Sequence, residues 1–219
     1  MLDWPGRLSV TVFIAGCDLR CPFCHNPDLV DPGNADASSL MGLFEHLYSR
    51  RDWIDGVVVT GGEPTSDPDI LDLLHAIHDM DMEIKFDTNG NNPRVLRKVL
   101  DSGLVSYVAM DVKATPEKYS QATGGRGSWS RAQESVELIR ASGIDHEFRT
   151  TVFPDAVSEH DLPRIAQLLS GGNLYALQQF RPQVTLDHAA TEVPPMHPDT
   201  LAACALRCSN HLPTVTRGV

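Results

Sequence analysis

The sequence lacks the features that mark membrane-spanning and secreted proteins. Its 219 residues contain no run of about 18 uncharged apolar residues, the length that a membrane-spanning helix needs. The first residues, Met-Leu-Asp-Trp-Pro-Gly, do not form a basic segment followed by an apolar stretch, with which a secretory signal begins. We therefore expect a cytoplasmic protein that binds no membrane.

Positive charge is scarce. The 18 Lys and Arg residues are outnumbered by 29 Asp and Glu residues, which gives a net charge of −11 and a pI of about 5.1. Such a chain repels a phosphate backbone, so we expect no nucleic-acid partner. With 42% hydrophobic and 21% charged residues, the composition is that of an ordinary globular protein.

Cysteine is also rare, and its spacing argues against a disulfide framework. Three of the five cysteines fall within the eight positions from Cys17 to Cys24. Disulfide-stabilised secreted domains are usually shorter and contain an even number of cysteines. The spacing indicates metal or redox chemistry in a reducing compartment.

Two local patterns alternate along the chain. Short, mostly apolar and often β-branched runs predict buried strands, and stretches with helical spacing follow each of them. The predicted strands are 8–14, 57–60, 83–87, 106–112, 146–152 and 174–180, and the predicted helices are 38–51, 71–78, 93–102, 130–142, 158–169 and 198–210.

A strand followed by a helix, six times over, builds a parallel sheet with right-handed crossovers. We expect one α/β domain over residues 1–219, folded as an open, partial (β/α)6 barrel, because six units fall short of the eight that close a standard barrel. A doubly wound sheet has the same local pattern. Both folds place ligands at the carboxyl ends of the strands.

Unusual residues follow the first four predicted strands. The three cysteines come after the first strand, Gly61-Gly62-Glu63-Pro64 after the second, Asp87-Thr88-Asn89-Gly90 at the end of the third, and Asp111 and Lys113 at the end of the fourth. The carboxyl ends of parallel strands meet at one edge of a sheet, so these side chains are predicted to converge on one site.

The cysteine spacing C-x3-C-x2-C can supply three thiolates to an iron–sulfur cluster and leave its fourth iron without a protein ligand. A zinc site is the alternative. A structural zinc ion takes four ligands, so the fourth would be His25 or a distant cysteine.

The segment from Cys17 to Pro27 resembles the cluster loop of radical S-adenosylmethionine (SAM) enzymes, including the aromatic Phe23 before the third cysteine. The longer stretch from Asp3 to Pro27 is similar to the activating proteins of anaerobic ribonucleotide reductase, and more loosely to the activating enzyme of pyruvate formate-lyase. The resemblance covers about the first 115 residues well. Residues 15–27 are called the cluster loop below.

The resemblance implies a radical SAM oxidoreductase whose cofactors are a 4Fe–4S cluster and SAM. In this family SAM chelates the open iron, and the reduced cluster then cleaves SAM to give a 5′-deoxyadenosyl radical. The cluster and SAM thus supply the chemistry, and no further catalytic residue is expected. Cys17, Cys21 and Cys24 would be the cluster ligands, Phe23 would pack near the adenine, and Asn26 would hydrogen-bond a cluster sulfide.

Three further segments match family motifs. Gly61, Gly62 and Glu63 match the glycine-rich motif that meets the SAM ammonium group, and Asp87 and Asn89 belong to the aspartate-containing segment that contacts the amino group. Lys113 would meet the SAM carboxylate. By analogy with the pyruvate formate-lyase activator, a monovalent cation would have as ligands Asp87, Thr88, the carbonyl of Ala109 and Asp111.

The predicted partner is a glycyl radical enzyme, with anaerobic ribonucleotide reductase as the best candidate, and flavodoxin or ferredoxin as the electron donor. An open barrel leaves a lateral entrance for the partner's glycine loop. No second set of cluster cysteines is present, which argues against an inserted ferredoxin-like domain. The alternatives are a small-molecule radical SAM enzyme resembling 7-carboxy-7-deazaguanine synthase, and a non-catalytic zinc-binding module.

The later part of the chain offers weaker candidates. Arg149, Gln179 and Arg181 end the fifth and sixth strands and suit the ribose or the partner. The run 122–128 is predicted to be a flexible connector or a loop that adapts to a partner. Cys204 and Cys208 share one face of the last helix, where they either pack as small residues or share a metal or disulfide.

Overall fold

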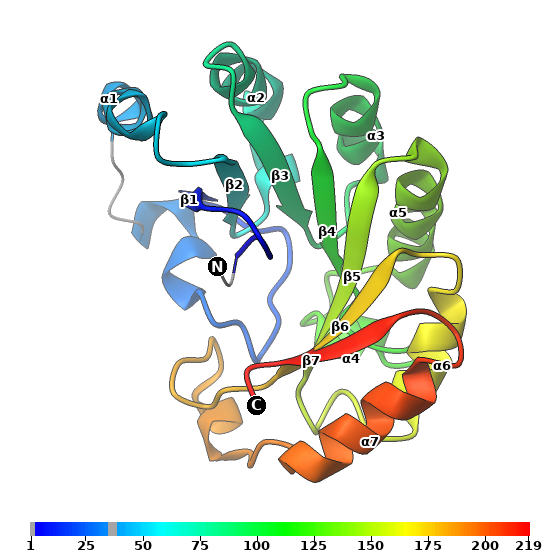
Figure 1. Ribbon diagram of the computed structural model, residues 1–219. Helices are drawn as coiled ribbons and strands as arrows, with labels where there is room; N and C mark the ends of the chain where they lie inside the picture. The colour runs from blue at the N-terminus through cyan, green and yellow to red at the C-terminus, as the bar shows by residue number, and fades with distance from the viewer. Residues whose placement is uncertain (1–2, 35–38) are drawn as a thin grey trace.

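Seven parallel strands form one sheet in the computed structural model, which describes residues 3–34 and 39–219. Each strand pairs with the next one in the sequence, from β1 (Ser9–Ile14) to β7 (Thr214–Arg217), so the sheet fans out in chain order (Figure 1). This sequential order excludes a doubly wound sheet, in which the order of strands reverses. Within the described residues β1 and β7 do not pair, and the fold is therefore an open, partial barrel.

The predicted fold class and all six predicted strand–helix units are confirmed, with boundaries shifted by a few residues. Ser38, the first residue of the predicted helix 38–51, lies outside the described residues. The remaining strands are β2 (Gly56–Gly61), β3 (Glu83–Thr88), β4 (Tyr107–Asp111), β5 (Asp145–Val152) and β6 (Leu174–Gln179), and the helices are α1 (Leu40–Arg50), α2 (Ile70–His78), α3 (Pro93–Asp101), α4 (Tyr119–Ala122), α5 (Trp129–Ser142), α6 (Asp161–Leu168) and α7 (Pro198–Cys208).

The prediction of six strands is wrong by one, because β7 was not foreseen. It has only four residues, Thr-Val-Thr-Arg, and pairs with β6 from Tyr175↔Thr214 to Gln178↔Arg217. A strand this short depends on its neighbour for stability, so the local sequence carries little signal for it. The short helix α4 was missed for the same reason.

The two faces of the sheet differ in polarity because successive side chains of a strand point to opposite faces. The outer face packs under the helices (Figure 1). Val57, Phe86 and Phe148 are fully buried on this face. The inner face is lined by polar side chains, among them Lys85 and Glu147, both buried. The hydrophobic core therefore lies between sheet and helices, and the inside of the barrel is left for a polar site.

Helix ends near that site follow simple capping rules. Asn92 precedes α3 and its side-chain oxygen accepts from the Val95 N–H at 3.4 Å, while Pro93 occupies the first helical turn. The amide group of Asn92 also donates to the Thr65 carbonyl at 3.1 Å, which ties α3 to the segment after β2. No described helix has the length and apolar character needed to cross a bilayer.

Candidate functional site

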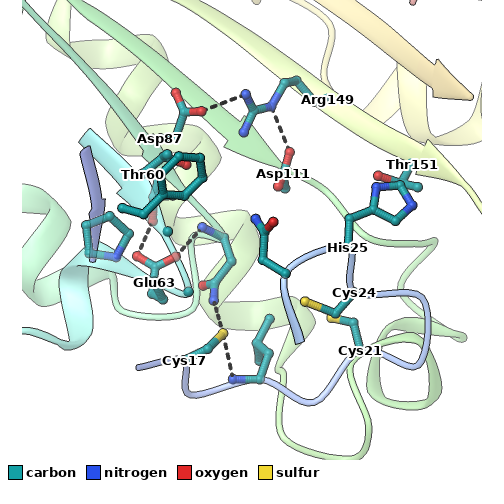
Figure 2. A pocket seen from close by; sticks show the side chains of 18 of the residues that line it. Cys17, Cys21, Cys24, His25, Thr60, Glu63, Asp87, Asp111, Arg149 and Thr151 are labelled. Atoms are coloured by element: carbon teal, nitrogen blue, oxygen red, sulfur yellow. Dashed lines mark hydrogen bonds and ion pairs between the residues drawn. The ribbon is translucent and has the colours of Figure 1, made fainter. Parts of the chain in front are cut away.

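A cavity of about 420 Å³ opens at the carboxyl ends of the strands, as predicted. The cluster loop forms one wall, and the ends of β2 to β5 form the other (Figure 2). The structure brings almost every predicted site residue to this cavity: Cys17, Cys21, Phe23, Cys24, Asn26, Gly61, Gly62, Glu63, Asp87, Thr88, Asn89, Asp111 and Lys113. Ala109 is the exception, because it lies fully buried within β4.

The cluster loop is held in a curled conformation by backbone hydrogen bonds and by the side chain of Arg20. The Cys17 N–H donates to the Val30 carbonyl at 3.0 Å, and the Cys24 N–H donates to the Cys21 carbonyl at 3.1 Å. Arg20 donates to the carbonyl of Cys17 at 2.6 Å. These bonds place all three cysteines along the same wall of the cavity (Figure 2).

Part of the run 122–128 supports the cluster loop from behind, a contact that its composition does not predict, while residues 124–126 are exposed. The Arg20 N–H donates to the Thr123 carbonyl at 3.2 Å. Gly124 has φ +65°, and a Cβ atom there would lie 2.2 Å from the Arg20 carbonyl oxygen. The Thr123 hydroxyl accepts from the Gly127 N–H at 3.0 Å. Gly124 therefore permits close packing under the cluster loop.

Asp18 is a site residue that the sequence reasoning missed. Its two carboxylate oxygens accept from the side chains of Asn89, at 2.9 Å, and Asn91, at 2.6 Å. Asn89 also points its amide group at the Cys17 sulfur, at 3.8 Å. Asp18 therefore joins the cluster loop to the loop after β3 and orients the amide that faces Cys17. Only this tertiary contact distinguishes Asp18 from an ordinary loop aspartate.

Glu63 is buried at the end of β2 and gathers four hydrogen bonds. Its carboxylate accepts from the backbone and hydroxyl of Thr65, at 3.1 and 2.6 Å, from the Thr88 hydroxyl at 2.7 Å and from the Asn89 N–H at 2.6 Å. Burial raises the pKa of Glu63 to about 7 although these donors oppose the shift. A nearby cationic ligand would restore the charged form.

Gly61 and Gly62 are required by the backbone itself. A Cβ atom on Gly61, where φ is +136°, would lie 2.2 Å from the Ile14 carbonyl oxygen, and one on Gly62 would lie 2.2 Å from that of Gly16. Both positions therefore need glycine for the end of β2 to pass beside the start of the cluster loop. The close approach positions Glu63, whose N–H donates to the Gly16 carbonyl at 2.7 Å.

Five charged side chains alternate in sign across the ends of β3, β4 and β5. Lys85 and Arg149 both donate to Asp87, and Arg149 and Lys113 both donate to Asp111. Burial alone would raise the pKa of Asp111, but Arg149 and Lys113 outweigh it and hold this pKa well below its usual range. Burial likewise opposes the charge of Lys113, and Asp111 overcomes it, so the Lys113 pKa is raised.

The cysteines fit an iron–sulfur cluster. Burial raises the pKa of Cys17 to about 12 and that of Cys21 to about 11, so both are neutral thiols until a metal displaces their protons. Across residues 3–34 and 39–219, no three His, Cys, Asp or Glu side chains surround one position suited to a single metal ion. Three cysteines on one wall of the cavity suit an iron–sulfur cluster, whose usual protein ligands are cysteine thiolates.

The same residues do not fit the expected monovalent cation. Arg149 lies between the two carboxylates that were predicted to hold it, as Figure 2 shows. Thr88 is also engaged, because its hydroxyl donates to Glu63 and accepts from the Gly90 N–H at 3.1 Å.

The candidates after β6 are placed differently from the prediction. Gln178, and not Gln179, lines the cavity, because neighbouring residues of a strand face opposite ways. The Gln179 amide instead donates to the Met196 carbonyl at 2.6 Å, and Arg181 is exposed. Cys204 and Cys208 are fully buried in α7 and are free thiols, as expected for packing residues.

Comparison with known proteins defines the class. The model of the radical SAM superfamily matches residues 11–169, and the chain belongs to this superfamily of enzymes. Its members use a 4Fe–4S cluster and SAM, in agreement with the cofactors predicted above. Membership of an enzyme superfamily is at odds with the alternative of a non-catalytic zinc module.

The sequence relatives narrow the class. A Methanocaldococcus jannaschii protein, provisionally assigned as a glycyl-radical enzyme activating enzyme, is 28% identical over 88% of this chain and 81% of its own length. The pyruvate formate-lyase-activating enzyme of Clostridium pasteurianum is 24% identical over 77% and 72% of the two chains. A 7-carboxy-7-deazaguanine synthase of Thermococcus kodakarensis is 25% identical over 76% and 72%.

Solved structures support the fold. Streptococcus suis SuiB superposes with a TM-score of 0.70 at 15% identity, over 96% of this chain and 49% of SuiB. The chain thus spans about half the length of SuiB. A second SuiB structure contains SAM. At this identity the likeness concerns the fold alone.

Proposed function

We propose that this radical SAM enzyme is an activating enzyme that generates a glycyl radical on a partner protein. The observation that carries the proposal is the cavity itself, where three cysteines face Glu63, Asp87 and Lys113 across the open edge of the sheet. The activating enzymes among its sequence relatives support the same reading.

In the proposed complex, Cys17, Cys21 and Cys24 would hold the cluster, and the cavity between the cluster loop and the strand ends would accept SAM. A cluster held there would, when reduced, supply the electron for cleavage of SAM into methionine and a 5′-deoxyadenosyl radical. Phe23 would contact the adenine, because it lines the cavity. Its ring is held by stacking on Phe153, with the two ring centroids 5.1 Å apart. Asn26 lines the same wall, where its amide can donate to the cluster.

Glu63 and Lys113 offer opposite charges to the two ends of an amino acid. The Glu63 carboxylate suits the SAM ammonium group, and its donors Thr65, Thr88 and Asn89 fix its orientation. Lys113 and Arg149 both pair with the single negative charge of Asp111. The Lys113 ammonium is therefore only partly neutralised and can attract the SAM carboxylate. Asp87 has an ion pair on each carboxylate oxygen, which makes its contact with the SAM amino group secondary to its structural role.

The open side of the barrel supports a macromolecular substrate. Phe13 on β1 lines the cavity and is 53% exposed, and within the described residues no strand covers the edge of β1 (Figure 1). A glycine-bearing loop can enter beside Phe13 and reach the cavity. We propose anaerobic ribonucleotide reductase as the partner, on the similarity of residues 3–27 to its activating proteins, and flavodoxin or ferredoxin as electron donor. The cytoplasmic location stays a prediction from the sequence.

One experiment separates this proposal from the small-molecule alternative. The anaerobically reconstituted protein is mixed with SAM, a reductant and the large subunit of an anaerobic ribonucleotide reductase from the same genome. We expect a glycine-centred doublet in the electron paramagnetic resonance spectrum of the partner, lost when the radical-site glycine of the partner is replaced by alanine. Turnover of a pterin without any partner protein would instead favour the small-molecule alternative, which the Thermococcus relative supports.

A further inference from the structure

The guanidinium group of Arg149 occupies the space between two inward-facing carboxylates. Its Nη1 donates to Asp87 Oδ2 at 2.8 Å, and its Nε donates to Asp111 Oδ1 at 2.8 Å (Figure 2). The Arg149 side chain is 13% exposed. These carboxylates are the two charged ligands of the monovalent cation that the sequence resemblance implied.

Strand register fixes this arrangement. Asp111 is the register partner of Arg149 in the β4–β5 ladder, and Asp87 is the partner of Ala109 two residues earlier on β4. Residues two apart on a strand share a face, so Asp87, Asp111 and Arg149 all point into the barrel from three adjacent strands. The arginine is therefore held between the two acids by the backbone of the sheet.

The local charge count leaves no place for a further cation. Lys85 donates to the remaining oxygen of Asp87, and Lys113 donates to the remaining oxygen of Asp111, at 2.9 Å. Three cations thus face two carboxylates, a surplus of one positive charge. A further cation beside the guanidinium would be repelled by it, and both oxygens of each carboxylate already accept from a basic side chain.

We propose that Arg149 takes the place of a bound monovalent cation in this enzyme. It is a positioning residue that orients Asp87 and Asp111. Because it shares Asp111 with Lys113, part of the Lys113 charge remains to attract the carboxylate of SAM. The guanidinium is permanently charged and planar, and it donates in a fork that matches two carboxylates, which lysine cannot do. The enzyme accordingly binds SAM equally well with or without potassium and sodium.

The first test uses the unaltered protein. SAM affinity of the reconstituted protein, and the melting temperature of the protein before reconstitution, are measured in potassium, sodium and choline chloride at equal ionic strength. We expect less than about a twofold difference in affinity and no selective thermal stabilisation by either metal ion, because a bound cation would stabilise the fold by mass action. An affinity about tenfold higher in potassium or sodium, the size of a typical coupling between two bound ligands, would overturn the proposal.

The second test creates the missing site. Arg149→Ala leaves two carboxylates with an empty position between them, so SAM affinity in choline chloride should fall about tenfold and recover in potassium or guanidinium chloride. Its melting temperature should rise by about 5 °C in potassium but not in choline. Arg164→Ala is the matched control, because Arg164 pairs with Glu117 on the surface and should behave as the unaltered protein.

A third variant covers the case in which Arg149→Ala does not fold. Arg149→Lys keeps the charge but reaches one carboxylate at a time, so it should bind SAM more weakly than the unaltered protein with no response to potassium. If Arg149→Ala folds, binds SAM normally and ignores potassium, or if Arg149→Lys acquires a potassium response, Arg149 does not act as the cation. The melting temperatures are measured without cluster or partner. A wrong assignment of Arg149 can therefore be told apart from a wrong proposal of glycyl radical activation.

Discussion

Replacing Glu63 with glutamine should change how the stability of the metal-free protein depends on pH. Burial raises the pKa of Glu63 from 4.5 to about 7 in the folded protein, whereas the unfolded chain exposes it to water. Between these two values the folded state binds more protons than the unfolded state. The contribution of Glu63 to stability is therefore present at low pH and is lost as the pH rises from 4.5 to 7.

The size of the effect follows from the shift. One pKa unit corresponds to about 1.4 kcal/mol, so a rise from 4.5 to about 7 is worth about 3 kcal/mol, of which about 2 kcal/mol is lost between pH 5 and pH 8. Glutamine does not titrate. At every pH the glutamine NH2 group would face the Asn89 N–H, so that two donors meet and the hydrogen bond is lost. This should lower the free energy of unfolding by about 1 to 3 kcal/mol.

Equilibrium urea unfolding of both proteins from pH 5 to pH 8, without metal and with reductant, measures this difference. All other titrating groups are shared, so subtracting the Glu63→Gln curve isolates Glu63. We expect the stability advantage of the unaltered protein to shrink by about 2 kcal/mol across this range, equivalent to about 6 °C in melting temperature. An advantage that stays constant or grows with pH would refute the assignment of a buried carboxyl with a raised pKa.

Three further substitutions test the cluster loop. Cys21→Ser should abolish retention of a four-iron cluster by anaerobic iron analysis, whereas Cys208→Ala, at a buried cysteine far along the chain in α7, should leave the iron content unchanged. Gly124→Ala should destabilise the fold by several kcal/mol and reduce cluster uptake, because its Cβ would lie 2.2 Å from a backbone oxygen of the cluster loop. Gly125→Ala is the control, also at positive φ but with nothing within 4 Å, and it should lower the stability measured by thermal unfolding by only about 1 kcal/mol. Asp18→Ala removes the acceptor of two buried asparagine side chains, so we expect a loss of about 2 kcal/mol and faster loss of the cluster, seen as bleaching of visible absorbance; unchanged bleaching would show that Asp18 does not support the loop.

Much of this architecture could be predicted from local sequence. The six longer strands follow from runs such as Val57-Val58-Val59, and the site follows from the rule that polar residues at the carboxyl ends of parallel strands converge. The cysteine spacing and the resemblance placed the cluster loop on one wall of the cavity, where the structure has it.

Features that depend on tertiary pairing could not be predicted. The bridge made by Arg149 depends on the register between β4 and β5, which no local pattern reports. The contact of Asp18 with the loop after β3 joins residues more than 70 positions apart. The run 122–128 has the composition of a flexible loop, and only the packing of Gly124 against Arg20 shows that this glycine permits a close approach.

The most direct test of the account is the amount of 5′-deoxyadenosine released from SAM by the reduced protein after anaerobic reconstitution with iron and sulfide. The account predicts about four irons per chain and release of 5′-deoxyadenosine that requires both reductant and Cys17, Cys21 and Cys24. Protein that takes up zinc instead, or that forms the cluster and leaves SAM intact when supplied with electrons, would contradict it.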